Sequence, residues 1–169
     1  MRDFRLGRKF RLVTIPFRPM QLLYTVEDQL AALKSEAAHL DQGAILAFDV
    51  FYPSKFESLA VGLGEERLEA ERTSPADPAI VIRRFYRKDS VDKIHQTYAL
   101  TYIFRTFRDG ELILEETDTL KMSFYTYPHL RALFLLAGLE IVEEYGSFAK
   151  TPMDNSATEM IFLLRHARP

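Results

Sequence analysis

The chain has 169 residues, of which 47 % are hydrophobic and 27 % are charged; its formal net charge is −2 and it contains no cysteine. These values are typical of one folded globular domain with a real core. They exclude disulfides and thiolate metal sites, and they give no electrostatic basis for binding nucleic acid or an anionic membrane. There is no signal peptide and no apolar run of about 18 residues, so we expect a cytoplasmic protein.

Residues 11–53 predict a strand, a helix and a second strand. The outer segments, 11–17 and 44–51, are short apolar runs rich in β-branched and aromatic residues, whereas 25–40 has apolar residues at helical spacing. Strands that are apolar on both faces favour a parallel sheet covered by helices. The pattern therefore predicts a βαβ unit.

Both predicted helices carry end signals. Thr25 followed by Asp28 is a variant of the capping box, and Gly43 is expected to end that helix. Thr126 and Gly138 have the same roles for a second helix, whose inward residues are expected to be apolar. These inward residues are Leu130, Leu133, Phe134 and Leu136.

Residues 54–125 differ in character from the flanking segments. The stretch 65–72 is charged and predicts one short helix. Aromatic and β-branched runs then predict a three-stranded antiparallel sheet, and Asp109-Gly110 predicts a tight hairpin between two of its strands. The expected strands are 79–87, 93–107 and 111–125.

Several motifs resemble class I S-adenosylmethionine-dependent methyltransferases. Residues 1–4, Met-Arg-Asp-Phe, are similar to the end of the family's "GDMRDF" loop, and 40–44 is similar to its "LKPGG" segment. Residues 125–130 together with 136–140 resemble "YT..EL..LL..AGF", and 156–165 resembles the last strand of the family. The resemblance spans most of this chain but only the C-terminal half of the family domain.

The resemblance implies an α/β fold. Residues 1–53 and 126–169 would form a partial Rossmann-like core, and 54–125 would be a lid-like insertion over the acceptor substrate. Two final strands, 139–148 and 158–166, would complete the sheet, with the last strand antiparallel to its neighbours. The expected strand order is 11–17, 44–51, 158–166, 139–148.

The resemblance also implies S-adenosylmethionine as the cofactor. The residues that would lie beside it are Met1, Arg2, Asp3, Ile15, Pro16, Phe17 and Leu22. The glycine-rich turn and the acidic strand end that hold this cofactor in the family would precede Met1. Gly62-Leu63-Gly64 is no substitute, because it lacks a strand-to-helix context and a third glycine. We therefore expect this chain to bind the cofactor weakly or not at all.

Ligands of open α/β sheets bind at the carboxyl ends of the strands, which directs attention to the loops after residues 17 and 51. Candidate substrate-side residues are Tyr24, Asp49, Tyr52, Tyr102 and Tyr125. Asp49 lies in an apolar run, so it is expected either to bond to a neighbouring loop or to face a cleft. The aromatic residues have a core-packing alternative. The methyl acceptor would be a small or medium-sized molecule.

No catalytic residue is assigned. The histidines, at positions 39, 95, 129 and 166, have no metal-ligand spacing, so no metal site is expected. Ser54, Ser58 and Ser123 lack the G-x-S-x-G elbow of a hydrolase. Methyl transfer from a sulfonium depends mainly on in-line positioning, so a conspicuous catalytic motif is not required.

Two functions remain open from the sequence. The first is a methyltransferase homologue that acts with an upstream segment or through another chain. The second is a non-catalytic methyltransferase-like domain serving assembly or ligand binding. Because strand 11–17 would lack its family neighbour, its free edge predicts a homodimer.

Overall fold

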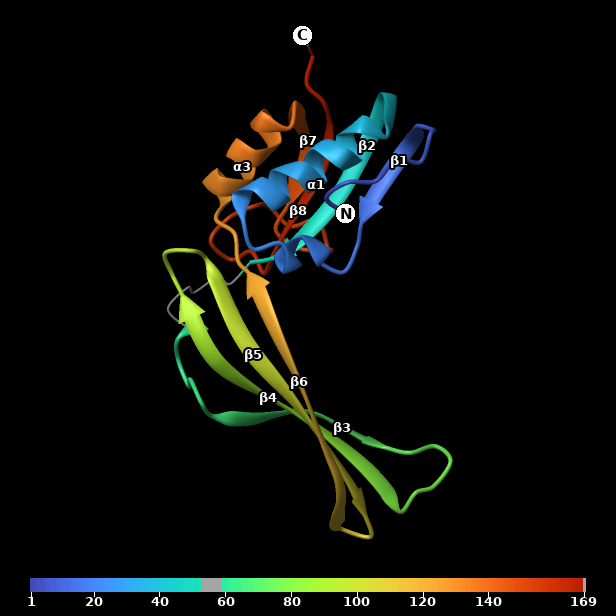
Figure 1. The fold of residues 1–169 in the computed structure, drawn as a ribbon, viewed down its shortest axis with the longest axis vertical. Coiled ribbons are helices and arrows are strands. Elements are labelled where there is room, and N and C mark those ends of the chain that lie inside the picture. The colour runs from blue at the N-terminus through green and yellow to red at the C-terminus, as the bar shows by residue number, and fades with distance from the viewer. Residues whose placement is uncertain (53–58, 169) are drawn as a thin grey trace. The chain divides into compact units, whose positions relative to one another are not determined.

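The computed structural model describes residues 1–52 and 59–168. The chain divides into two compact units (Figure 1): one comprises Met1–Lys55 with Met122–Pro169, and the other comprises Phe56–Lys121. Ser54 and Ser58 lie outside the described residues. Among the described residues, no helix is long and apolar enough to cross a membrane.

The described residues of the first unit form a four-stranded mixed sheet in the order β1-β2-β8-β7. β1 (Phe10–Ile15) is parallel to β2 (Leu40–Phe51), and β8 (Glu159–His166) is antiparallel to both β2 and β7 (Leu139–Tyr145). This confirms the predicted strand order and the predicted parallel pair.

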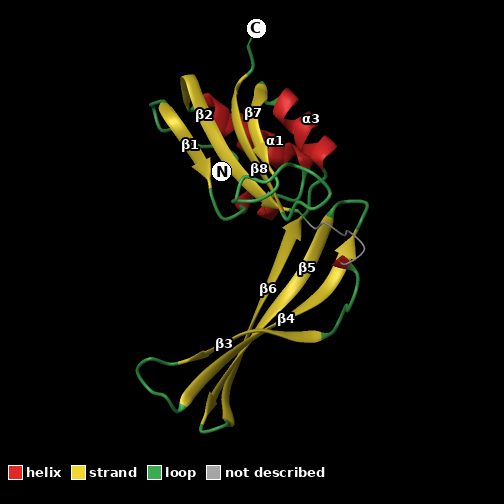
Figure 2. Ribbon diagram, turned by 180° about the vertical axis from the view of Figure 1, so that it is seen from behind, coloured by secondary structure: helices red, strands yellow, loops and turns green. Residues whose placement is uncertain are grey.

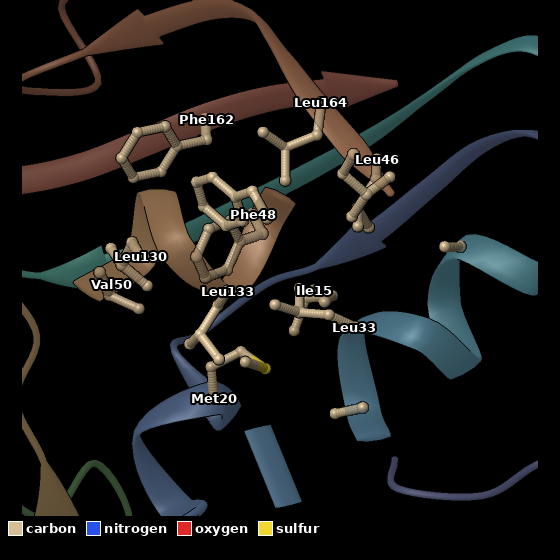
Figure 3. Packing of buried hydrophobic residues seen from close by; sticks show 14 of the residues in the cluster. Ile15, Met20, Leu33, Leu46, Phe48, Val50, Leu130, Leu133, Phe162 and Leu164 are labelled. Carbon is tan, nitrogen blue, oxygen red and sulfur yellow. The ribbon is translucent and has the colours of Figure 1, made fainter. Parts of the chain in front are cut away.

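The core of this unit lies between the sheet and the helices α1 (Val26–Ala38) and α3 (Tyr127–Leu136), which cover the same face of the sheet (Figures 1 and 2). Phe48 and Phe162, on adjacent strands, stack at 5.7 Å between ring centroids, and Phe134 of α3 meets Phe162 edge-on at 5.0 Å. Figure 3 shows Leu130 and Leu133 packed in the same cluster. Burial of these side chains is the main stabilising term of the unit.

The predicted start of α1 is confirmed, because the Thr25 hydroxyl accepts a hydrogen bond from Asp28 N at 3.2 Å. The predicted role of Gly43 is wrong. α1 ends at Ala38, and β2 already begins at Leu40, so that Gly43, with φ 73°, lies inside the strand. β2 starts before the glycine because Phe10 N already donates a hydrogen bond to His39 O. A shift of register in the pairing of β1 with β2 then accommodates Gly43.

α3 differs from its sequence pattern at two residues. Thr126 occupies the position before the helix, but its side chain makes no capping hydrogen bond within the described residues, contrary to the prediction. Leu130, Leu133 and Phe134 are buried, whereas Leu136 is 61 % exposed, contrary to the prediction. Gly138 has φ 72° directly after the helix, as its terminating role requires.

The described residues of the second unit belong to a four-stranded antiparallel sheet in the order β3-β4-β5-β6, with one strand more than predicted. Its strands are β3 (Glu66–Thr73), β4 (Ile80–Asp92), β5 (Thr97–Arg108) and β6 (Glu111–Ser123). The hairpin turn is confirmed, with positive φ at both Asp109 and Gly110.

The predicted helix at 65–72 is wrong, since this segment is β3. Its acidic residues form ion pairs with arginines of β4: Glu71 lies 2.6 Å from Arg83 Nε, and Glu69 lies 3.0 Å from Arg84 Nε. Charges that are compatible with a helix in isolation become cross-strand pairs in the sheet.

β1 is an edge strand, and we propose that a second copy of the chain pairs with it. Leu12 is 59 % exposed on β1, whereas Val13 packs against the core. A two-fold axis perpendicular to the sheet, passing midway between the two Leu12 residues, would pair β1 with its copy and place the two Leu12 side chains opposite each other.

Leu12→Lys is therefore expected to convert a dimer into monomers, because it sets two ammonium groups face to face. Light scattering at micromolar concentration measures the mass. The matched control is Leu135→Lys on α3, where the leucine is 69 % exposed. A monomeric wild-type chain, or equal dissociation by both changes, would contradict the proposal.

Candidate functional site

The candidate site lies at the edge of the first unit's sheet where β1 and β2 end. Parallel strands bring their carboxyl ends to one edge, and ligands of open α/β sheets bind there. Two segments border this edge (Figure 1): the β1–α1 loop, residues 16–25, which contains the 3₁₀ turn η1 (Pro19–Leu22), and the β7–β8 loop, residues 146–158.

The buried amide of Gln21 fixes the β1–α1 loop. This fully buried side chain donates to Ser123 O and accepts from Phe51 N, both at 2.9 Å. Ser123 Oγ in turn donates to Leu23 O at 2.7 Å. An unsatisfied buried amide is costly, so these bonds hold the loop in one conformation.

The loop begins with strained backbone. Phe17 and Arg18 are consecutive non-glycine residues with φ of 64° and 61°. Left-handed conformations of such residues cost about 1–3 kcal/mol each, and they cluster at functional sites. Phe17 is held 95 % exposed by this geometry, at the position where a ligand would approach the edge.

Arg18 joins two carboxylates from different strands. Its guanidinium bonds to Glu159 at the start of β8 and lies 3.6 Å from Asp49 Oδ2 of β2. The Asp49 side chain is 12 % exposed, and the Glu159 side chain is equally shielded. Asp49 therefore forms an ion pair with the neighbouring β1–α1 loop, and its contact with a substrate remains a prediction.

The electrostatics of this cluster favour proton uptake. Burial raises the pKa of Asp49 above its ordinary value, and Arg18 offsets part of that rise. Burial likewise raises the pKa of Glu159, with the neighbouring Asp49 charge acting in the same direction and Arg18 against it. Glu159 Oε2 has no hydrogen-bond partner within residues 1–52 and 59–168. Both carboxyls therefore hold a proton more readily than they would in water.

The structure places the predicted cofactor-side residues in two groups. Ile15 is buried at the end of β1, and Pro16, Phe17 and Leu22 are exposed in the loop that follows. The second group is the N-terminal segment. Arg2 pairs with Asp28 of α1 at 2.9 Å, and Met1 and Asp3 on either side of it are exposed. Cofactor contact remains a prediction for all of them.

The predicted substrate-side tyrosines do not form one cluster. Tyr24 is 42 % exposed at the end of the loop, and Tyr52 lines a groove beside α3. Tyr125 is fully buried and donates to Met20 O at 2.6 Å, so it contributes to the core. Tyr102 belongs to β5 of the second unit. Their contact with a substrate remains a prediction.

Three residues of this edge were not among the predicted site residues: Arg18, Gln21 and Glu159. The sequence holds weak signals for two of them, since Arg18 precedes a proline directly after a strand and Glu159 opens an otherwise apolar strand. Within the described residues, no group of His, Asp or Glu has the arrangement of a metal site.

Comparison with solved structures shows which fold this is. A S-adenosylmethionine-dependent methyltransferase from Clostridium acetobutylicum superposes with a TM-score of 0.77 over 99 % of this chain, at 15 % identity. The chain has the fold of part of a class I S-adenosylmethionine-dependent methyltransferase. CalS10, an amino pentose methyltransferase from Micromonospora echinaspora solved with S-adenosylmethionine bound, matches this methyltransferase fold over 97 % of the chain, with a TM-score of 0.72 and 20 % identity.

The match covers only part of these enzymes, because the chain spans 62 % and 61 % of the two solved chains. In sequence, 57 residues are 42 % identical to the dTDP-3-amino-3,4,6-trideoxy-alpha-D-glucopyranose N,N-dimethyltransferase of Streptomyces venezuelae, which is 33 % of this chain and 24 % of that protein. No protein-family model matches the sequence. The comparisons confirm the resemblance and establish the fold.

Arg18→Gln is expected to destabilise the chain more at pH 7 than at pH 4. The carboxyls of Asp49 and Glu159 have higher pKa values in the folded chain than in the unfolded chain. As the pH rises above their ordinary pKa values, the unfolded chain loses these two protons first, and the folded state therefore loses stability. Arg18 offsets this loss only when the carboxyls are charged. Its removal should cost roughly 1–3 kcal/mol at pH 7, allowing for its partial exposure, and little at pH 4.

Thermal melts at the two pH values measure the difference. The control is Arg2→Gln, which breaks an exposed pair with Asp28 and should have little effect at either pH. A loss for Arg18→Gln that does not depend on pH would show that the guanidinium does not stabilise these carboxylates.

Proposed function

We propose that the chain is part of an S-adenosylmethionine-dependent N-methyltransferase that acts on the amine of a small molecule of the amino-sugar class. The observation that carries this proposal is the 42 % identity over 57 residues to a protein named as an amino-sugar N,N-dimethyltransferase. The methyltransferase fold supports it, as does the polar cluster at the edge where ligands of such sheets bind.

The edge has the chemistry that amine methylation needs. An amine attacks the methyl group only after it has lost its proton, so a nearby acceptor of raised pKa is useful. Asp49 and Glu159 have this property. Arg18 would hold both carboxylates in position. In this proposal one of these two carboxylates accepts the amine proton.

The cofactor part of the proposal concerns S-adenosylmethionine. The bound cofactor would supply the methyl group on its sulfonium. The 169 residues do not include the family's glycine-rich turn, whose backbone amides contribute much of the affinity. We therefore propose that this chain has only weak affinity of its own for the cofactor.

The alternative is a non-catalytic domain used for assembly or ligand binding. Two features favour the catalytic function. The strained backbone at Phe17 and Arg18 and the shielded Asp49–Arg18–Glu159 cluster both cost stability, and a purely structural domain gains nothing from them.

The test is a nuclear magnetic resonance titration of the labelled chain with S-adenosylhomocysteine. We expect millimolar binding, with amide shifts concentrated in residues 15–23, and no micromolar binding by calorimetry. Phe17→Ser should reduce these shifts because it removes an exposed ring at the edge. The matched control is Phe148→Ser, which removes another exposed ring from the β7–β8 loop.

Shifts that are absent, or that are confined to other parts of the chain, would contradict the cofactor proposal. Micromolar affinity of the cofactor for this chain would contradict the proposed weak affinity.

A further inference from the structure

A second site lies on the helix-covered side of the same sheet edge. It is a groove of about 340 Å³ between the end of β2, the start of α3 and the β7–β8 loop. Its lining includes Tyr52, Tyr127, Glu144, Asp154 and Met160. Its volume is at the lower end of the range for small-molecule pockets, which suits a single sugar-sized ring.

The β7–β8 loop is held closely against the end of β7, so the groove has a fixed wall. Gly146 N bonds to Thr151 O at 2.9 Å, and Gly146 O accepts from Thr158 N at 3.1 Å. A Cβ at Gly146 would lie 2.4 Å from Pro152 O, so only glycine allows this approach.

The charge of the groove is negative. Glu144 and Asp154 line it, and none of its described lining residues is Lys or Arg. Arg131 is a cation near this groove, with its Cζ 6.0 Å from the centroid of the Tyr127 ring. The groove therefore favours a cationic ligand.

Glu144 and Asp154 each accept a hydrogen bond at one carboxylate oxygen, which orients the side chain and leaves the other oxygen for a ligand. Tyr127 donates its hydroxyl to Glu144 Oε2 at 2.7 Å, and Ser156 donates its backbone N–H to Asp154 Oδ1 at 2.8 Å. Glu144 Oε1 and Asp154 Oδ2 have no bond to the described part of the chain. The bonds from Ser156 lower the pKa of Asp154, so this carboxylate remains charged.

The remaining walls also suit a cation. Tyr52 and Tyr127 contribute aromatic surface, and Met153 and Met160 contribute polarizable thioethers. Burial, together with the Glu144 carboxylate, raises the pKa of Tyr127, and the neighbouring Arg131 offsets part of that rise, so the Tyr127 hydroxyl stays protonated and continues to donate to Glu144.

We propose that this groove binds a small molecule through a protonated amine held between Glu144 and Asp154. This binding involves neither the cofactor nor the Asp49–Arg18–Glu159 cluster, so it stands apart from the proposed function. An amino sugar is chosen as the probe because it carries a protonated amine on a ring that suits the volume of the groove.

The experiment compares two probes by chemical-shift titration, without any cofactor. D-glucosamine carries an ammonium group, and N-acetyl-D-glucosamine is its neutral counterpart of similar shape. Glucosamine is expected to bind with millimolar affinity and to shift the amides of residues 153–157, whereas the acetylated sugar should not shift them.

Glu144→Gln is expected to weaken glucosamine binding about tenfold, through loss of one partly screened charge contact. The glutamine oxygen can still accept from Tyr127, so the fold should persist. The control is Glu143→Gln, because Glu143 is exposed on the same strand and likewise accepts from a tyrosine hydroxyl. Asp154→Asn is the second variant, used if Glu144→Gln fails to fold.

Equal binding of the two sugars, equal weakening by the control, or no shift at the groove would overturn the proposal. The cofactor is absent from this titration, so glucosamine binding supports the groove even if the S-adenosylhomocysteine titration fails. Conversely, binding of S-adenosylhomocysteine without binding of glucosamine would support the proposed function and contradict the groove.

Discussion

The geometry of the candidate site, at the carboxyl ends of β1 and β2, depends on one buried side-chain amide. Gln21 joins the loop after β1 to two other segments of the first unit: the end of β2, through Phe51 N, and Ser123, through its backbone oxygen. These three segments are far apart in the sequence, and the amide brings their backbone groups together at the carboxyl ends of the parallel strands. Because the amide is fully buried, moving the loop would leave polar groups unsatisfied. The strain at Phe17 and Arg18 is thereby maintained.

The polar cluster at the same edge has an electrostatic cost. Burial raises the pKa of both carboxyls, and the one guanidinium that they share offsets only part of that rise. Such an arrangement adds little to stability compared with apolar packing. Its chemical consequence is a pair of carboxyls with raised pKa values, which the proposed transfer of a methyl group to an amine would use.

Local patterns were sufficient to predict where the strands and helices of the first unit lie in the sequence. The apolar runs and the Thr25 cap identified the strands and the helix, and the resemblance supplied the strand order. The errors arose where tertiary contacts override local preference. The charged segment of β3 pairs with arginines of β4, and Gly43 is absorbed by a shift of strand register. The Arg18–Glu159 contact spans 141 residues of sequence, so only the folded sheet shows it.

The central claim is that this edge belongs to an enzyme that methylates an amine. The most direct measurement is methyl transfer by the protein purified from its native cells, with S-adenosylmethionine and a dTDP-linked amino sugar, followed by mass spectrometry of both products. We predict a methylated amine and an equal amount of S-adenosylhomocysteine. Absence of the methylated amine, in a preparation that does bind the cofactor, would contradict the claim and favour the non-catalytic alternative.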